Sequence, residues 1–127
     1  MSTNQFKGTG VALVTPFKSD LSIDFEALKQ LLDHVSEGDV EYLVVLGTTG
    51  EAPTLSYDEK LQLFSIVKKS VGADVAVIAG TTDNNTQVSI DLSKSIYYNV
   101  SKDSKNLILI KSDFLKLKVK KKFDIVI

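Results

Sequence analysis

Residues 42–56 read YLVVLGTTGEAPTLS, and this stretch decides the fold class. Its apolar residues 43–46 run without a polar interruption, which favours a strand covered on both faces, as in parallel α/β sheets. A turn with two threonines between two glycines follows. Because ligands meet the carboxyl ends of the strands in such sheets, we expect this turn to carry the functional site.

The rest of the chain repeats the pattern of a strand followed by a helix. Strands are predicted at residues 11–14, 42–46 and 75–79, and their starts lie 31 and 33 residues apart. This is the length of successive βα units in a parallel sheet. Helix starts are predicted at Asp24, at a capping box of Ser56 and Glu59, and after residues 83–85. Two α/β architectures stay open: a doubly wound open sheet, and the first part of a (β/α)8 barrel.

Both architectures predict the same candidate surface. It consists of Thr15 and Pro16, residues 47–52 and residues 80–85, each after a predicted strand. Thr48 and Thr49 offer hydroxyls beside glycine backbone, a suitable cradle for a small carboxylate or phosphate, and a hydroxyl can also relay protons. The alternative interpretation is that residues 47–50 form an ordinary βα turn without a binding role.

Composition excludes several other classes of site. The 127 residues contain no cysteine and one histidine, His34, which falls late in the first predicted helix, so no metal site is expected. All 15 basic residues are lysines, and the run at 116–122 predicts a solvated face, not a nucleic-acid surface. No stretch has the length of a signal peptide core or a membrane span. We therefore expect a soluble, cytoplasmic protein.

Three segments carry a resemblance to one family: FKGTGVALVTPF (6–17), LVVLGTTGEAPTLS (43–56) and VAVIAGTTDNNT (75–86). In order and spacing they resemble the opening strands of the dihydrodipicolinate synthase and N-acetylneuraminate lyase family, and GTTGEAPTL is more similar to the synthase branch. The resemblance covers residues 6–92. It implies a (β/α)8 barrel and, without a cofactor, class I aldolase chemistry in which a lysine forms a Schiff base with pyruvate. In the synthase branch the enamine then attacks aspartate semialdehyde in lysine biosynthesis.

The resemblance also implies roles for single residues. Thr49 is similar to the threonine that holds the pyruvate carboxylate, and Thr48 to the hydroxyl of a proton relay between tyrosines. The rest of that signature is similar to Gly47, Gly50 and Glu51. The TPF turn of the family, after its first strand, is similar to Thr15 and Pro16. Glu51 can serve as an acid or base, or tie down a neighbouring loop. The Schiff-base lysine would lie in a GIKE-like segment, which these 127 residues do not contain.

Residues 93–127 form a divergent tail after the barrel-like residues 1–92. The tail holds nine lysines and three aspartates, a charge of +6, whereas residues 1–92 carry −7. A frameshift in an AT-rich gene is one hypothesis. An internal deletion is another, because YYNV at 97–100 and KKFDIVI at 121–127 resemble the catalytic-tyrosine segment and the strand before the lysine. Tyr98 would then be the relay tyrosine; otherwise Tyr97 and Tyr98 are ordinary helix residues.

We expect only about three βα units, and no fourth-strand segment precedes YYNV at 97–100. A complete barrel takes about 250 residues, so we expect an incomplete synthase, inactive alone, whose full-length form is a homo-oligomer as in the family. One alternative is a lyase similar to N-acetylneuraminate lyase, or another pyruvate aldolase. Another is a non-catalytic fragment that binds a small acid or regulates a full-length relative. A flavodoxin-like phosphate-binding domain is disfavoured, because no phosphate-loop lysine is present.

Overall fold

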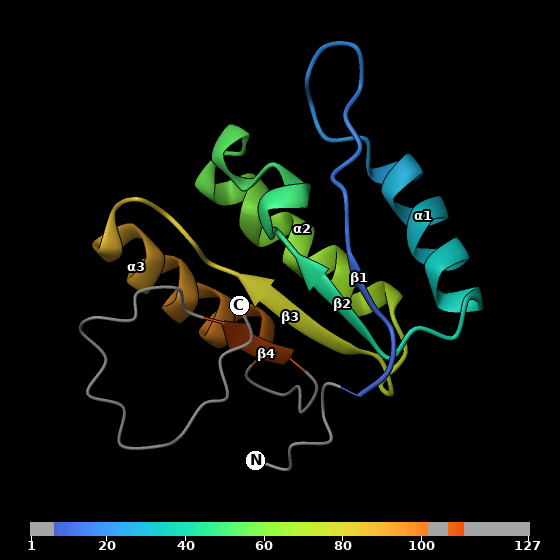
Figure 1. The fold of residues 1–127 in the computed structure, drawn as a ribbon. Helices are drawn as coiled ribbons and strands as arrows, with labels where there is room; N and C mark the ends of the chain where they lie inside the picture. The colour runs from blue at the N-terminus through green and yellow to red at the C-terminus, as the bar shows by residue number, and fades with distance from the viewer. Residues whose placement is uncertain (1–6, 102–106, 111–127) are drawn as a thin grey trace.

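The computed structural model describes residues 7–101 and 107–110, which form a parallel sheet with helices along one face (Figure 1). The sheet has the order β1-β2-β3-β4, with strands at Gly10–Ala12, Tyr42–Val45, Ala76–Gly80 and Leu107–Ile110. The helices are α1 (Phe25–Glu37), α2 (Tyr57–Ser70) and α3 (Thr86–Ile96). The three predicted βα units are thereby confirmed. No helix within the described ranges is long and apolar enough to span a bilayer.

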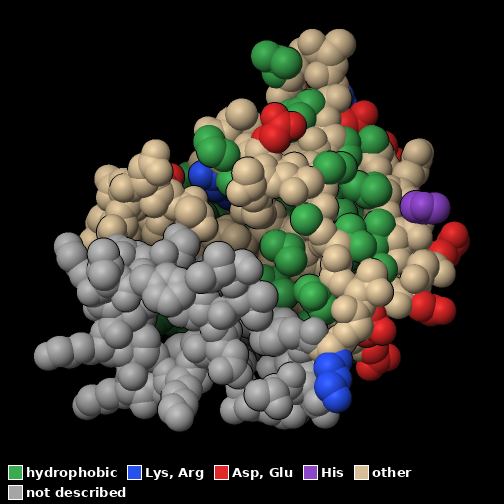
Figure 2. Space-filling view, viewed as in Figure 1, with side chains coloured by type: hydrophobic (Ala, Val, Ile, Leu, Met, Phe, Trp, Pro, Cys, Tyr) green, Lys and Arg blue, Asp and Glu red, His purple; other side chains and the backbone are tan. Residues whose placement is uncertain are grey.

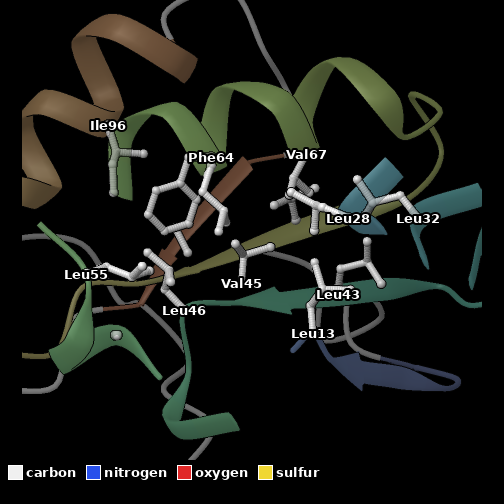
Figure 3. Close-up of a cluster of buried hydrophobic side chains, with 14 of the residues drawn as sticks. Leu13, Leu28, Leu32, Leu43, Val45, Leu46, Leu55, Phe64, Val67 and Ile96 are labelled. Carbon is white, nitrogen blue, oxygen red and sulfur yellow. The ribbon is translucent and has the colours of Figure 1, made fainter. Parts of the chain in front are cut away.

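Strand β2 lies between β1 and β3, and its alternate residues build the core. Leu43 pairs with Val11 and Val77, and Val45 pairs with Ala79. Leu43 and Val45 are each 1% exposed and point toward the helices, where Phe64 and Val67 of α2 meet them (Figure 3). On the opposite face Val44 is half-buried, so the uninterrupted apolar run is covered less evenly than we predicted.

Strand β4 lies in the tail and was not predicted from the sequence. Residues 107–110 (LILI) pair in parallel with β3, with Ile108 beside Ile78. Four apolar residues in a row are a strand signal, but the lysine-rich composition around them concealed it. Residues 121–127, on which the deletion hypothesis partly rests, lie outside the described residues.

The helix starts follow the predicted caps. The Asp24 carboxylate accepts the Ala27 N–H at 3.0 Å, and Asn85 accepts the Gln87 N–H at 2.9 Å. At α2 the capping box is complete, because the Ser56 hydroxyl oxygen accepts the Glu59 N–H at 3.3 Å. In return the Glu59 carboxylate accepts the Ser56 N–H at 2.8 Å and the Ser56 hydroxyl at 2.7 Å. These two hydrogen bonds, the side-chain one most, hold the pKa of Glu59 below its ordinary value.

A protruding loop joins β1 to α1, and Leu21 lies in it with φ at 69° and 81% exposure. Short backbone hydrogen bonds close the loop, from Leu21 N–H to the Lys18 carbonyl at 3.0 Å and from Lys18 N–H to the Ser22 carbonyl at 2.8 Å. A left-handed conformation is unfavourable for a residue with a Cβ. Leu21 is therefore a local source of strain without compensating burial.

We expect Leu21→Gly to raise the free energy of unfolding in urea by about 0.5–1 kcal/mol. The left-handed conformation costs a non-glycine residue roughly 1–2 kcal/mol, and the greater freedom of glycine in the unfolded chain offsets part of this gain. Leu21→Ala is the control, because it keeps a Cβ. An equal gain in both variants would attribute the effect to removal of an exposed leucine instead.

A second prediction concerns acid. Because the pKa of Glu59 is lowered in the folded protein, the capping box contributes stability above the unfolded pKa of about 4.3 and loses it as pH falls through the folded pKa. Glu59→Gln should flatten the decline in urea stability between about pH 5 and 3, while Asp58→Asn, in the same helical turn, should keep it. Identical declines in wild type and Glu59→Gln would refute this assignment.

Candidate functional site

The loop after β2 consists of two short helical turns joined by strained residues. Leu46 leaves the strand with φ at 55° and only 2% exposure. A 3₁₀ turn, Thr48–Gly50, follows Gly47, and Glu51 with φ at 54° leads into a second one, Ala52–Thr54. Within the first turn the side chains of Thr48 and Thr49 are exposed, whereas Gly50 is buried. The two hydroxyls therefore stand on a turn whose end is anchored in the protein.

Residues that follow β1 hold one side of this loop. The Thr15 hydroxyl, in a side chain 6% exposed, donates a hydrogen bond to the Gly50 carbonyl at 2.7 Å. A Cβ at Gly50 would lie 3.2 Å from the Leu13 carbonyl oxygen. The backbones of residues 13 and 50 are therefore so close that a side chain at position 50 has little space. Pro16 accepts the Asp24 N–H at 2.9 Å and ties the same segment to the start of α1.

The end of β3 holds the other side. A Cβ at Gly80 would overlap the carbonyl group of Leu46 and lie 3.0 Å from the Gly47 nitrogen. Only glycine allows the two backbones to approach this closely. Sequence reasoning placed residue 80 on the candidate surface but did not predict this contact. The signal was the position of a glycine at the end of an apolar strand.

The two Gly-Thr-Thr sequences of the chain have different surroundings. After β3, Thr81 is buried at 1% exposure and shares a hydrogen bond of 3.0 Å with the Ser93 hydroxyl. Of the two threonines in this loop, Thr81 and Thr82, only Thr82 is exposed. After β2, both Thr48 and Thr49 are exposed, so this loop presents two adjacent hydroxyls at the carboxyl edge of the sheet.

The structure brings together most of the predicted site residues, but not all. Thr15, Gly47, Thr48, Thr49 and Gly50 lie in one loop cluster. Glu51 is exposed and accepts hydrogen bonds through its backbone carbonyl from the N–H of Thr54 at 2.9 Å and from the Thr54 hydroxyl at 2.9 Å. These bonds give residue 51 a place in the backbone of the loop.

Tyr98 is not placed in this cluster. It lies in a π-helical turn, Tyr97–Ser101, at the far end of α3 from the β3 loop, and it is 65% exposed. Its ring meets Tyr97 edge-on, with the ring centroids 5.4 Å apart. Both tyrosines are thus helix residues here, and a relay role for Tyr98 stays a prediction of the deletion hypothesis.

The chemistry open to the cluster is that of neutral hydroxyl groups. Among the described residues no group of three or more His, Cys, Asp or Glu could hold a metal ion, and His34 is exposed on α1. Each threonine hydroxyl can donate one hydrogen bond and accept others. Two of them side by side can hold a small carboxylate or pass a proton.

Comparisons with known proteins point to one family. A family model described as the dihydrodipicolinate synthetase family matches residues 5–99. The 4-hydroxy-tetrahydrodipicolinate synthase of Oceanobacillus iheyensis is 49% identical over 85 residues, which are 67% of this chain and 29% of that protein. The synthase of Flavobacterium psychrophilum is 44% identical over 107 residues, covering 74% of this chain and 36% of that protein. The chain thus spans about a third of the length of these curated relatives.

Solved structures that resemble this chain are dihydrodipicolinate synthases as well. A dihydrodipicolinate synthase from Bacillus anthracis is 43% identical, with a TM-score of 0.66, over 70% of this chain and 30% of that one. The synthase from Acinetobacter baumannii, complexed with pyruvate, is 32% identical, with a TM-score of 0.71, over 82% of this chain and 35% of that one.

The close approach at the end of β3 gives a stability test. We expect Gly80→Ala to lower the free energy of unfolding by about 1–3 kcal/mol, because the new methyl group meets the Leu46 carbonyl, which belongs to the backbone and cannot turn away as a side chain can. Gly72→Ala is the matched control, since no atom lies within 4 Å of a Cβ there. Equal urea midpoints for the two variants would show that the loop yields freely at this contact.

Proposed function

The chain belongs to the dihydrodipicolinate synthetase family, and on this premise we propose that it serves the reaction of the 4-hydroxy-tetrahydrodipicolinate synthases. These residues would supply part of the site that condenses pyruvate with aspartate semialdehyde in lysine biosynthesis. The observation that carries the proposal is the exposed pair Thr48 and Thr49 on a turn whose end is buried against the segment that follows β1.

In the proposed site the two threonines have different tasks. The hydroxyl of Thr49 donates to the pyruvate carboxylate, and the hydroxyl of Thr48 passes a proton during the condensation. Hydrogen bonds to a charged group contribute roughly 1.5–3 kcal/mol each. Gly47 and Gly50 allow the backbone to turn closely beneath the ligand, and Glu51, Thr15 and Pro16 support the loop. The pyruvate complex of the related A. baumannii enzyme supports the choice of ligand.

The covalent step needs a lysine that these 127 residues do not supply in a GIKE-like segment. We therefore propose that this polypeptide by itself binds pyruvate without forming a Schiff base. Cytoplasmic location and a homo-oligomer for the full-length form belong to the same proposal, and family membership supports them.

Pyruvate titration of the purified chain tests the binding role. We expect Thr49→Val to weaken pyruvate binding about tenfold or more, because a hydrogen bond to the carboxylate is lost. Thr9→Val is the control: Thr9 is exposed just before β1, at the opposite edge of the sheet, and its substitution should leave the Kd unchanged. Equal Kd values for wild type and Thr49→Val would overturn the assignment of Thr49.

Reduction with borohydride in the presence of pyruvate tests the second claim. We expect no increase in mass, since trapping requires a lysine Schiff base. A stable pyruvate adduct on the monodisperse 127-residue protein would refute the claim that it cannot do the covalent step. Binding of a flavin, with no response to pyruvate, would favour the flavodoxin-like alternative.

A further inference from the structure

We propose that Thr15 is a positioning residue for the hydroxyl pair Thr48 and Thr49. The choice of pyruvate as the ligand rests on the proposed function, whereas the positioning role rests on the hydrogen bonds of the loop. Thr15 lies three residues beyond β1, and its buried hydroxyl donates to the Gly50 carbonyl at 2.7 Å. Gly50 ends the turn that begins with the two threonines. One hydrogen bond thus connects the segment after the first strand to the turn that follows the second.

Within the described part of the chain, the other hydrogen bonds of this turn are local. The Gly50 N–H donates to the Gly47 carbonyl at 3.0 Å, and the Glu51 N–H donates to the Thr48 carbonyl at 3.2 Å. Such bonds fix the shape of the turn but not its place relative to the sheet. The Thr15 bond joins residues 35 positions apart in sequence and therefore sets that place.

The turn is consequently held at both ends. Before it, the backbone of Leu46 and Gly47 packs against Gly80; after it, Gly50 is tied to Thr15. A binding group must be held within about 0.5 Å of its productive position, so a loop fixed at one end only would present the threonines less accurately. The Thr15 bond is buried, so without the hydroxyl the Gly50 carbonyl has to find a new partner by moving.

Three substitutions separate positioning from general stability. Thr15→Val keeps the shape of the side chain and removes the donor, while Thr15→Ser keeps the donor. Thr54→Val is the matched control, because the Thr54 hydroxyl also donates to a backbone carbonyl of the same loop, that of Glu51 at 2.9 Å, but connects it to no other strand. The measurements are the pyruvate Kd and hydrogen exchange at the amides of residues 47–51, with urea unfolding for each variant.

We expect Thr15→Val to raise the pyruvate Kd about tenfold and to speed exchange at the Gly50 amide, a tenfold change being about 1.4 kcal/mol. Thr15→Ser should stay within about threefold of wild type, and Thr54→Val should change neither measurement. If Thr15→Val does not fold, Thr15→Ala takes its place, since the smaller side chain leaves room for water at the Gly50 carbonyl.

An unchanged Kd and unchanged loop exchange in Thr15→Val, with lower stability alone, would reduce Thr15 to a structural residue. Failure of the wild-type protein to bind pyruvate would instead refute the proposed function. In that case the exchange rates of the valine and serine variants still decide whether Thr15 fixes the loop.

Discussion

The burial of Leu43 and Val45 against the helices is the constraint on which the rest of the structure depends. It fixes the register of β2 between its two neighbours, since Leu43 stands beside both Val11 and Val77. A shift by one residue would turn both side chains to the other face of the sheet. With β2 fixed, the chain must leave the sheet at Leu46, which it does in a left-handed conformation with its side chain still buried. The position of the threonine turn follows from this packing.

Sequence patterns predicted much of this arrangement, because their signals are local. The caps at Asp24, Ser56 and Asn85 are hydrogen bonds within two or three residues, which spacing alone reveals. The resemblance to the synthase family is likewise confirmed, since its motifs are continuous segments. Strand β4 escaped prediction because its partner, β3, decides whether four apolar residues in a lysine-rich segment pair.

The candidate site shows where local signals end. Gly-Thr-Thr occurs twice, after β2 and after β3, yet Thr81 is buried beside Ser93 while Thr48 and Thr49 are exposed. The same three residues thus serve as packing in one loop and as presented hydroxyls in the other. The loop after β2 is held by contacts between residues 34 and 35 positions apart, those of Leu46 with Gly80 and of Gly50 with Thr15. The spacing of residues in the sequence does not predict such contacts between distant segments.

The face of the sheet opposite the helices links this site to the rest of the family fold. Ala12, Val44 and Ile78 are paired across the three strands on that face, and hydrophobic side chains gather on it in Figure 2. Ala12 is exposed and Val44 half-buried, so the described residues cover the face incompletely. In a (β/α)8 barrel this face packs against side chains from the other strands, and the active site opens at the carboxyl ends of the same strands. Strands that bury Ala12 and Val44 in such a barrel would therefore also lie beside the loop that carries Thr48 and Thr49. In a barrel of this kind, the packing of this face and the surroundings of the threonine loop thus depend on the same strands.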